Sequence, residues 1–345
     1  MWNDEPMAAA GKPNGPRRTT ITDVARAAGV SPATISRVLN DSKRVSPDVA
    51  SRVLAAVEEL GYRPNPAAQV LLRGASHTIG VVVPDLSNPY FAEVLKAVTD
   101  TAASQQHRTL VADTNEDPGQ EMDLALELAR WVDGLVLCSP RMTSQQLKRL
   151  VEQLPRTVLV NRVLTGSSVP AVTVDFASGM RSVLAHLAEL GHRDVAYLAG
   201  PPAAWSDAQR RRAVRRAVKD GLQVHEVPCG SSSEAGYAAV DQALAARPTA
   251  LVAFSDYVAL GALARLNELG VSVPEELSLV GFDDLPFGEL VRPRLTTVSV
   301  VKAHLGKIAF DQLLTTEPPT AVTTVSATLV VRDSTAPPRA RRRRP

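Results

Sequence analysis

The stretch TTITDVARAAGVSPATISRVLN, residues 19–40, predicts two short helices joined by a tight turn. Thr22 is the expected N-cap of the first helix, and Gly29 is suited to the left-handed position that ends it. Ser31 and Pro32 then favour the start of a second helix within about three residues. The first helix has apolar residues at helical spacing: Ile21, Val24, Ala25 and Ala28. The pattern predicts a helix-turn-helix.

The second helix has one apolar and one outward face. Its apolar face comprises Ile35, Val38 and Leu39. The outward face of such a helix enters the DNA major groove, where Arg37 can bridge guanine O6 and N7. An ordinary helix pair with a solvated face is the alternative. Residues 17–73 favour DNA, because their nine Lys/Arg against five Asp/Glu give the sign that attracts phosphates.

The segments around this motif predict a small domain and a hinge. Ser46-Pro47 should start a third helix that ends at Gly61, with an apolar stripe at Val49, Val53, Leu54, Val57 and Leu60. Residues 63–77 contain two prolines and predict a hinge, whose Leu71 could insert between DNA base steps or dock on the next domain. Residues 1–18 predict a disordered leader, and residues 334–345, ending in RARRRRP, a disordered basic tail.

From Ile79 onward, short Val/Leu-rich runs alternate with amphipathic helices, which predicts an α/β fold with parallel sheets. The strands are too many for one small sheet, so we expect two sub-domains separated by a cleft. With 345 residues, 45% of them hydrophobic, the chain can bury a large core.

Several function classes find no support in the sequence. There is no HExxH, no GxSxG and no phosphate-binding glycine loop, so we expect no enzyme, no cofactor and no metal. Strand-end carboxylates could still form a glycosidase pair or a metal site. Cys138 and Cys229 lack CxxC spacing and fit free thiols in a reducing cytoplasm. We expect no export signal and no membrane span, and His186 and His192 to be capping or solvated.

Polar side chains follow most of the predicted strands, where ligands of parallel sheets bind. Among them are Asn88, Ser139, Asn161, Arg162, Ser255, Asp256 and Asp283. Carboxylates, amides and an arginine beside aromatic rings suit a sugar or similar metabolite. Capping of the next helix is the alternative for each position.

Five motifs resemble the lactose/galactose-repressor (LacI/GalR) family of bacterial transcription regulators: ITDVARAAGVSPATISRVLN, NPAAQVLLRG, IGVVVPDLSNPYFAEV, HLAELGHRDVAYLAGP and LSLVGFDDLPFGELVRPRLTTV. The resemblance implies a homodimer on a palindromic operator, with hinge helices that order on DNA. It implies an N-terminal helical DNA-binding domain over 19–62, a hinge over 63–77, and a periplasmic-binding-protein-like core over 78–333. The N-sub-domain of this core would be about 78–161 and 293–324, and the C-sub-domain about 162–292 and 325–333.

The resemblance also implies site residues. DNA contacts would come from Thr20, Thr22, Ser31, Pro32, Ala33, Thr34, Ser36, Arg37, Asn40, Asn65, Ala68 and Leu71. Effector contacts would come from Asn88, Tyr90, Phe91, Ser139, Trp205, Ser206, Arg210, Ser255, Asp256 and Asp283. Two positions depart from the family pattern: Ser255 stands where Asn is common, and Ser231 where many relatives place an aromatic.

These features predict a repressor whose operator affinity is controlled allosterically by a sugar or related metabolite. The sign of the response is open, since release by an inducer and binding with a corepressor both fit. A regulator that acts without ligand and a periplasmic type of sugar-binding protein are the alternatives. The lactose repressor's C-terminal leucine heptads are absent, so we expect a dimer.

Overall fold

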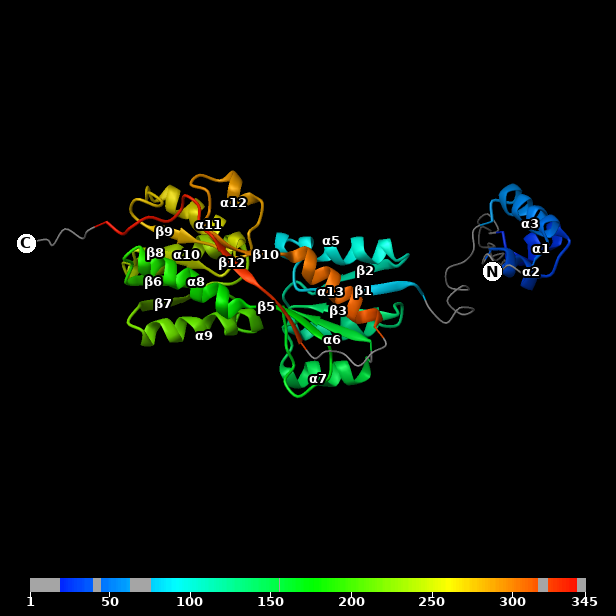
Figure 1. The fold of residues 1–345 in the computed structure, drawn as a ribbon, viewed down its shortest axis with the longest axis horizontal. Coiled ribbons are helices and arrows are strands. Elements are labelled where there is room, and N and C mark those ends of the chain that lie inside the picture. The colour runs from blue at the N-terminus through cyan, green and yellow to red at the C-terminus, as the bar shows by residue number, and fades with distance from the viewer. Residues whose placement is uncertain (1–18, 40–44, 63–75, 155, 316–321, 340–345) are drawn as a thin grey trace, which may run out of the picture. The chain divides into compact units, whose positions relative to one another are not determined.

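The computed structural model describes residues 19–39, 45–62, 76–154, 156–315 and 322–339. The chain divides into two compact units, Met1–Ser76 and His77–Pro345 (Figure 1). The first unit contains α1 (Ile21–Ala28), α2 (Pro32–Leu39) and α3 (Pro47–Glu59). The predicted helix-turn-helix is therefore present, followed by the predicted third helix.

The start and end of α1 follow from its sequence. Thr20, not Thr22, is the N-cap: its Oγ1 accepts from the Asp23 N–H, and the Asp23 carboxylate accepts from the Thr20 N–H. This reciprocal capping box needs an acidic residue three positions on, which Thr20 has and Thr22 lacks. Gly29 ends the helix with φ +65°, a left-handed conformation that favours glycine.

The three helices share a small apolar core of Val24, Ala25, Ala28, Ile35, Val53 and Ala56. The expected stripe of α3 is wrong at one position, because Leu54 is 54% exposed while Ala56 is buried. Ala56 lies three residues after Val53 and takes the inward position that we expected Leu54 to fill.

The first lobe of the second unit, here the N-lobe, is built on a six-stranded parallel sheet in the order β11-β5-β4-β3-β1-β2. Its strands are β1 (Thr78–Val83), β2 (Arg108–Asp113), β3 (Gly134–Cys138), β4 (Thr157–Val160), β5 (Ala171–Val174) and β11 (Val322–Val325). Helices α5 (Pro89–Ser104) and α13 (Lys302–Leu314) cover one face. Helices α6 (Pro118–Leu128) and α7 (Ser144–Gln153) cover the other.

The second lobe, the C-lobe, is built on a four-stranded parallel sheet in the order β7-β6-β8-β9. Its strands are β6 (Asp194–Ala199), β7 (Gln223–Pro228), β8 (Ala250–Ala253) and β9 (Ser278–Val280). Alternate residues of β6 point to opposite faces, towards α8 (Phe176–Glu189) and α9 (Trp205–Lys219) or towards α10 (Ser233–Ala245) and α11 (Asp256–Glu268). The short α12 (Phe287–Leu290) follows β9. This is the expected α/β fold with two parallel sheets.

The chain passes between the lobes at three points: β5 leads into α8, β10 (Thr297–Val300) into α13, and β11 into β12 (Ala327–Val330). Two expected boundaries differ from this topology. Residues 171–174 pair with β4 and β11 in the N-lobe sheet, because the crossing follows this buried strand instead of preceding it. Residues 297–300 pair with β12 instead of joining the N-lobe sheet.

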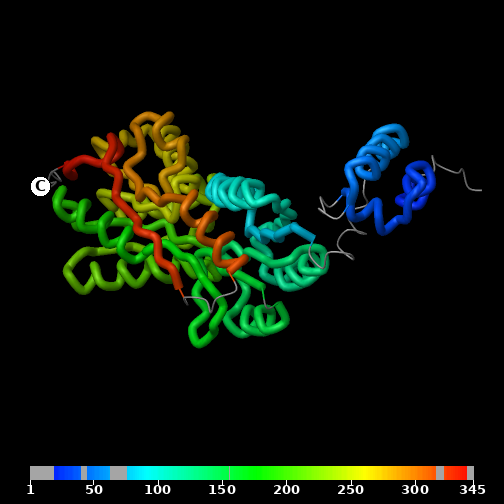
Figure 2. The backbone as a smooth tube through the Cα atoms, turned by 45° about the vertical axis from the view of Figure 1, so that its right-hand side comes forward, coloured from blue at the N-terminus to red at the C-terminus, as the bar shows by residue number. Residues whose placement is uncertain are grey.

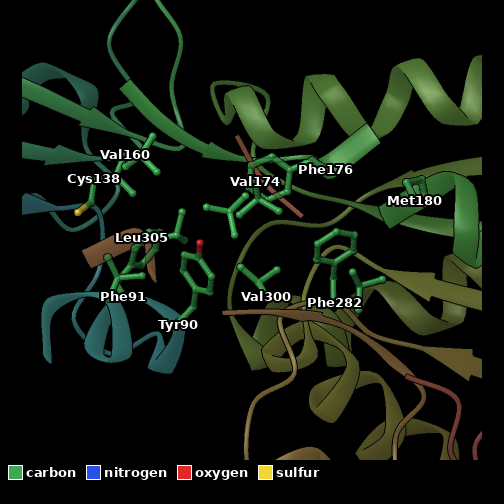
Figure 3. Packing of buried hydrophobic residues seen from close by; sticks show 14 of the residues in the cluster. Tyr90, Phe91, Cys138, Val160, Val174, Phe176, Met180, Phe282, Val300 and Leu305 are labelled. Carbon is green, nitrogen blue, oxygen red and sulfur yellow. The ribbon is translucent and has the colours of Figure 1, made fainter. Parts of the chain in front are cut away.

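One apolar core continues through both lobes at these crossings. Figure 3 shows Tyr90 and Phe91 of α5 near Val174, with Phe176, Val300 and Phe282 on the other side. Both cysteines are free thiols; Cys138 is buried in this core, and burial raises its pKa to about 12. Within the described ranges, no helix is long and apolar enough to cross a membrane.

The C-terminal segment 333–338 is docked on the C-lobe (Figure 2), so the tail expected from residue 334 does not begin there. Ser334 is buried and donates to the Leu279 carbonyl. His192 is completely buried between Thr249 Oγ1 and the Ala336 carbonyl, and is not solvated as expected. The segment stays docked because its hydrogen bonds satisfy buried polar atoms of the C-lobe.

We expect the contribution of His192 to the free energy of unfolding to be lost at acidic pH. Burial lowers the pKa of His192 below its ordinary value of 6.5. The unfolded chain then takes up a proton before the folded chain does, so the contribution is complete above the unfolded pKa of about 6.5 and decreases as the pH falls below it. Urea unfolding of the wild type and His192→Gln should show a difference at about pH 8 that shrinks at about pH 5.5. The exposed control His304→Gln should show no such shrinkage. If the difference in unfolding free energy between the wild type and His192→Gln were the same at both pH values, the lowered pKa assigned to His192 would be wrong.

Candidate DNA-binding face and candidate effector cavity

The outward face of the helix-turn-helix is accessible, as DNA reading requires. Pro32, Ala33 and Arg37 of α2 are exposed, and Thr34 and Ser36 are half-buried. Ser31 caps α2, because its Oγ accepts from the Thr34 N–H. The N-terminus of α2 therefore presents small side chains, with Arg37 at the next exposed turn.

The other expected DNA contacts divide into two groups. Thr20 and Thr22 are exposed at the start of α1, although the Thr20 hydroxyl already donates to Asp23 in the capping box. Four of the expected DNA contacts lie outside the described residues: Asn40, Asn65, Ala68 and Leu71.

A cavity lies between the two lobes and brings together eight of the ten expected effector contacts. These are Asn88, Tyr90, Phe91, Ser139, Ser206, Arg210, Ser255 and Asp283. The cavity is also lined by Asn161, which was expected among the polar residues that follow strands but not among the family contacts. Four further lining residues were not expected as contacts: Arg141, Phe176, Ser231 and Phe254. Its lining is therefore mostly polar, with aromatic rings from both lobes.

Trp205 and Asp256 do not line the cavity. The Trp205 ring packs against Phe176, with 6.4 Å between the ring centroids. Asp256 lies below the lining, where it accepts from Thr297 Oγ1 at 2.6 Å and from the Leu285 N–H at 2.7 Å. Burial raises the pKa of Asp256 to about 8. Asp256 thus positions the loop that carries Asp283.

Arg210 is the central cation of the C-lobe wall. Its guanidinium carbon lies 3.9 Å from the ring centroid of Phe282, 4.6 Å from that of Phe176 and 4.7 Å from that of Phe254. Its Nε and Nη1 are buried and have no hydrogen-bond partner among the described residues. Unpartnered buried donors are costly, so these atoms favour a ligand that offers oxygen.

Asp283 is the nearest carboxylate to Arg210, with 3.9 Å between Oδ1 and Nη2. This distance is beyond a hydrogen bond, and burial raises the Asp283 pKa to about 7 even though Arg210 and Lys302 lower it. The backbone of Asp283 is held by Lys302, whose Nζ donates to its carbonyl, and has φ +108°. The chain thus fixes a strained residue at the cavity wall.

The N-lobe wall is held by a second polar group. Asn161 Nδ2 donates to the Tyr90 hydroxyl at 2.6 Å, while Asn161 Oδ1 is buried without a partner in the described chain. Asn88 accepts from the Tyr90 N–H, and Ser255 accepts from the Val258 N–H. Helix capping, the alternative considered from sequence, therefore applies to Asn88 and Ser255 even though both line the cavity.

Glu116 connects the lobes across the cleft. Both of its carboxylate oxygens accept from Arg141, and Oε1 also accepts from Ser231 Oγ of the C-lobe at 3.1 Å. Arg141 is placed in turn by Glu121, which accepts from the Arg141 N–H and whose pKa is raised to about 7 by burial. With this link in place, the cavity has a volume of about 30 Å³, roughly the space of one or two water molecules. A sugar can enter only if the lobes separate.

Phe254 and Phe176, unlike Asn161, belong to no polar pattern after a strand. Phe254 ends the run ALVAF, and it fits because Gly200 lies against it; a Cβ on Gly200 would be 2.3 Å from the Phe254 ring. Phe176 is the first residue of α8. Only the juxtaposition of distant segments shows that both rings contact Arg210. Across the described ranges, no group of three or more His, Cys, Asp or Glu could hold a metal ion.

Comparisons with known proteins agree with this geometry. A family model described as bacterial regulatory proteins, lacI family, matches residues 20–65, and one described as a periplasmic binding protein-like domain matches residues 184–335. The HTH-type transcriptional regulator GalS of Salmonella typhimurium is 38% identical over 302 residues, 86% of this chain and 89% of that protein.

Two solved structures are similar over most of the chain. The lac repressor dimer bound to operator and the anti-inducer ONPF has a TM-score of 0.83 at 27% identity, covering 93% of this chain and 100% of that one. The complex of the transcriptional regulator CelR with cellobiose has a TM-score of 0.67 at 29% identity, covering 92% and 100%.

Replacing Arg210 with methionine should separate stability from ligand binding. Methionine lacks the two buried, unpartnered Arg210 nitrogens, each of which costs about 1–3 kcal/mol, and this relief offsets the lost ring contacts and the lost attraction to Asp283. We therefore expect Arg210→Met to leave the free energy of unfolding nearly unchanged. Any saccharide that raises the melting temperature of the wild type should no longer do so. Arg212→Met, an exposed position on the same helix, is the control and should keep the ligand response. Strong destabilisation by Arg210→Met would show that the guanidinium is structural.

Proposed function

The chain belongs to the lacI family of DNA-binding transcriptional regulators, and from this premise we propose that it is a repressor controlled by a small ligand in the cavity between its lobes. In this proposal two copies bind a palindromic operator, one helix-turn-helix on each half-site. The observation that carries the ligand assignment is the buried Arg210, with unpartnered nitrogens beside aromatic rings and Asp283.

The proposed ligand is a sugar or a related polyol. Hydroxyl groups can both donate to Asp283 and accept from Arg210 or Asn161, while the apolar face of a ring can contact phenylalanine. Cellobiose in the CelR complex has this chemistry. Ser231 offers a hydroxyl on the C-lobe wall, so stacking in this cavity would depend on Phe91, Phe176 and Phe254. The relatives are regulators and not enzymes, and no catalytic role is proposed for these residues.

Ligand control follows from the closed cavity. The lobes must separate to admit a sugar, which breaks the Glu116–Ser231 hydrogen bond, and must close again around it. A ligand that favours one arrangement by about 1–3 kcal/mol would change operator affinity roughly 5- to 150-fold. Hinge helices that include Leu71 would transmit the change, and the direction of the response would decide between inducer and corepressor.

A ligand-independent repressor is the second candidate. The observation in its favour is that the cavity is nearly filled by the chain's own side chains and is bridged by Glu116 and Ser231. In that case operator binding would be the same in every condition.

Operator titration tests the ligand-dependent proposal. A labelled inverted-repeat duplex selected with the purified protein would be titrated in the absence and presence of each saccharide that stabilises the protein. We expect at least one saccharide to change operator affinity by 5-fold or more, and Asp283→Asn to lose this response while still binding DNA. If saccharides bind the cavity and affinity never changes, the regulatory proposal is wrong.

Arg37 should read one base pair in each half-site. Because Arg37 is exposed on α2, we expect Arg37→Ala to weaken operator binding by about 1–3 kcal/mol and to relax base preference at a single position per half-site. Binding to a library of operator variants measures both effects. The matched control is Arg26→Ala on α1, which removes an exposed positive charge paired with Asp23. Equal weakening on all sequences would instead identify Arg37 as a phosphate contact.

A further inference from the structure

A second hollow lies on the C-lobe, between the C-terminal parts of α8 and α9. Figure 1 shows these two helices beside each other on one side of the C-lobe sheet. The hollow, here the α8–α9 groove, has a volume of about 460 Å³. The groove is therefore much larger than the cavity between the lobes, and it falls in the range of about 300–1,000 Å³ that small-molecule sites occupy.

The groove has an apolar floor. Leu184 of α8, Ala213 of α9 and Leu222 after α9 line it and are all buried. Alanines at 185, 188 and 217 form much of the rest, and their short side chains leave the space between the helices unfilled. This surface can bury an apolar group of a ligand.

The charges around the groove are mostly positive. Three arginines and one aspartate line it: Arg181, Arg193, Arg216 and Asp220. Arg193 is fixed by its Nη1, which donates to the Ala188 and His192 carbonyls. Asp220 lies 3.2 Å from Arg216, but both side chains are more than half exposed, so this pair is weak. The net charge of +2 therefore favours an anion.

The length of the groove indicates how large a bound molecule can be. The α8 residues that line it run from Arg181 to Ala188, about two turns or roughly 10 Å of helix. Gly221 and Leu222 line it where the chain leaves α9. A small molecule fits this length and volume. We propose that the α8–α9 groove is a second ligand site, which binds a small organic anion with an apolar body.

This site is connected to the cavity through the same two helices. The first residue of α8 is Phe176, and the first turns of α9 carry Ser206 and Arg210, all three in the cavity lining. Trp205, the first residue of α9, contacts the Phe176 ring. An occupant that changes the spacing of α8 and α9 would alter this contact, so Trp205 fluorescence can report occupancy of the groove.

Hexyl sulfate is a suitable probe, because it combines a short apolar chain with one anionic group and does not absorb where tryptophan emits. Calorimetric titration of the full chain should show one site, and 1-hexanol, which lacks the charge, should bind at least 5-fold more weakly. The double variant Arg181→Gln/Arg216→Gln should weaken hexyl sulfate at least 5-fold and leave 1-hexanol unchanged. The matched control Arg215→Gln removes an exposed arginine of α9 outside the groove lining and should bind like the wild type.

Two further measurements locate the site. Ala217→Trp should fill the groove and abolish binding, while circular dichroism and Arg37-dependent operator binding show that the variant folds. In a Trp2→Phe/Trp131→Phe background, hexyl sulfate should change the Trp205 emission with the same affinity as the calorimetric titration. Equal binding of hexyl sulfate and 1-hexanol, or no loss in either groove variant, would overturn the proposal. An acidic helical peptide that displaces hexyl sulfate and binds more tightly would also overturn it, in favour of a protein-docking surface.

Discussion

The three passages of the chain between the lobes are the constraint on which the second unit depends. The first passage runs directly from β5 into Asp175 and Phe176, so a cavity ring is fixed by a strand of the opposite lobe. The second places Lys302 where it can hold the carbonyl of Asp283. Because the C-lobe wall is held by residues at these passages, a change in the angle between the lobes must alter the cavity, and a ligand in the cavity must act on that angle.

Much of this arrangement could be predicted from local sequence, since the rules involved are local. The helix-turn-helix follows from spacing, Gly29 and the Ser-Pro helix starts. Asn88, Ser139, Ser255 and Asp283 follow from polar residues after buried strands, whereas the other expected effector contacts in the cavity were implied by the family resemblance. The errors arose where tertiary contacts decide. His192 was expected to have a capping or solvated role, yet the C-terminal segment folds back over it. Phe254 looked like the end of a core strand, and only its distance to Arg210 gives it a place in the cavity.

The buried carboxylates show how the C-lobe wall is kept in place without a close ion pair. Asp256 is held by Thr297 and the Leu285 N–H, and its raised pKa of about 8 indicates that burial outweighs these bonds for the charged form. Asp283, with a pKa raised to about 7, does not neutralise Arg210 at 3.9 Å. Burial therefore disfavours the charged form of both carboxyls, and a ligand hydroxyl that donates to Asp283 would favour its ionised form.

The closed cavity carries an energetic cost that a ligand can relieve. Arg210 Nε, Arg210 Nη1 and Asn161 Oδ1 are buried and lack partners within the described chain. An unsatisfied buried polar group costs about 1–3 kcal/mol, whereas the Glu116–Ser231 link that keeps the lobes together contributes at most about 1.5–3 kcal/mol as a hydrogen bond to a charged group. These costs are therefore comparable in size to the contribution of the link. A ligand that supplies oxygen atoms to Arg210 and a hydroxyl to Asn161 removes costs that only the closed form bears. A ligand can shift the populations of the two forms only if it binds one of them more tightly than the other. In this cavity, Arg210 Nε, Arg210 Nη1 and Asn161 Oδ1 are the atoms from which such a difference in affinity would arise.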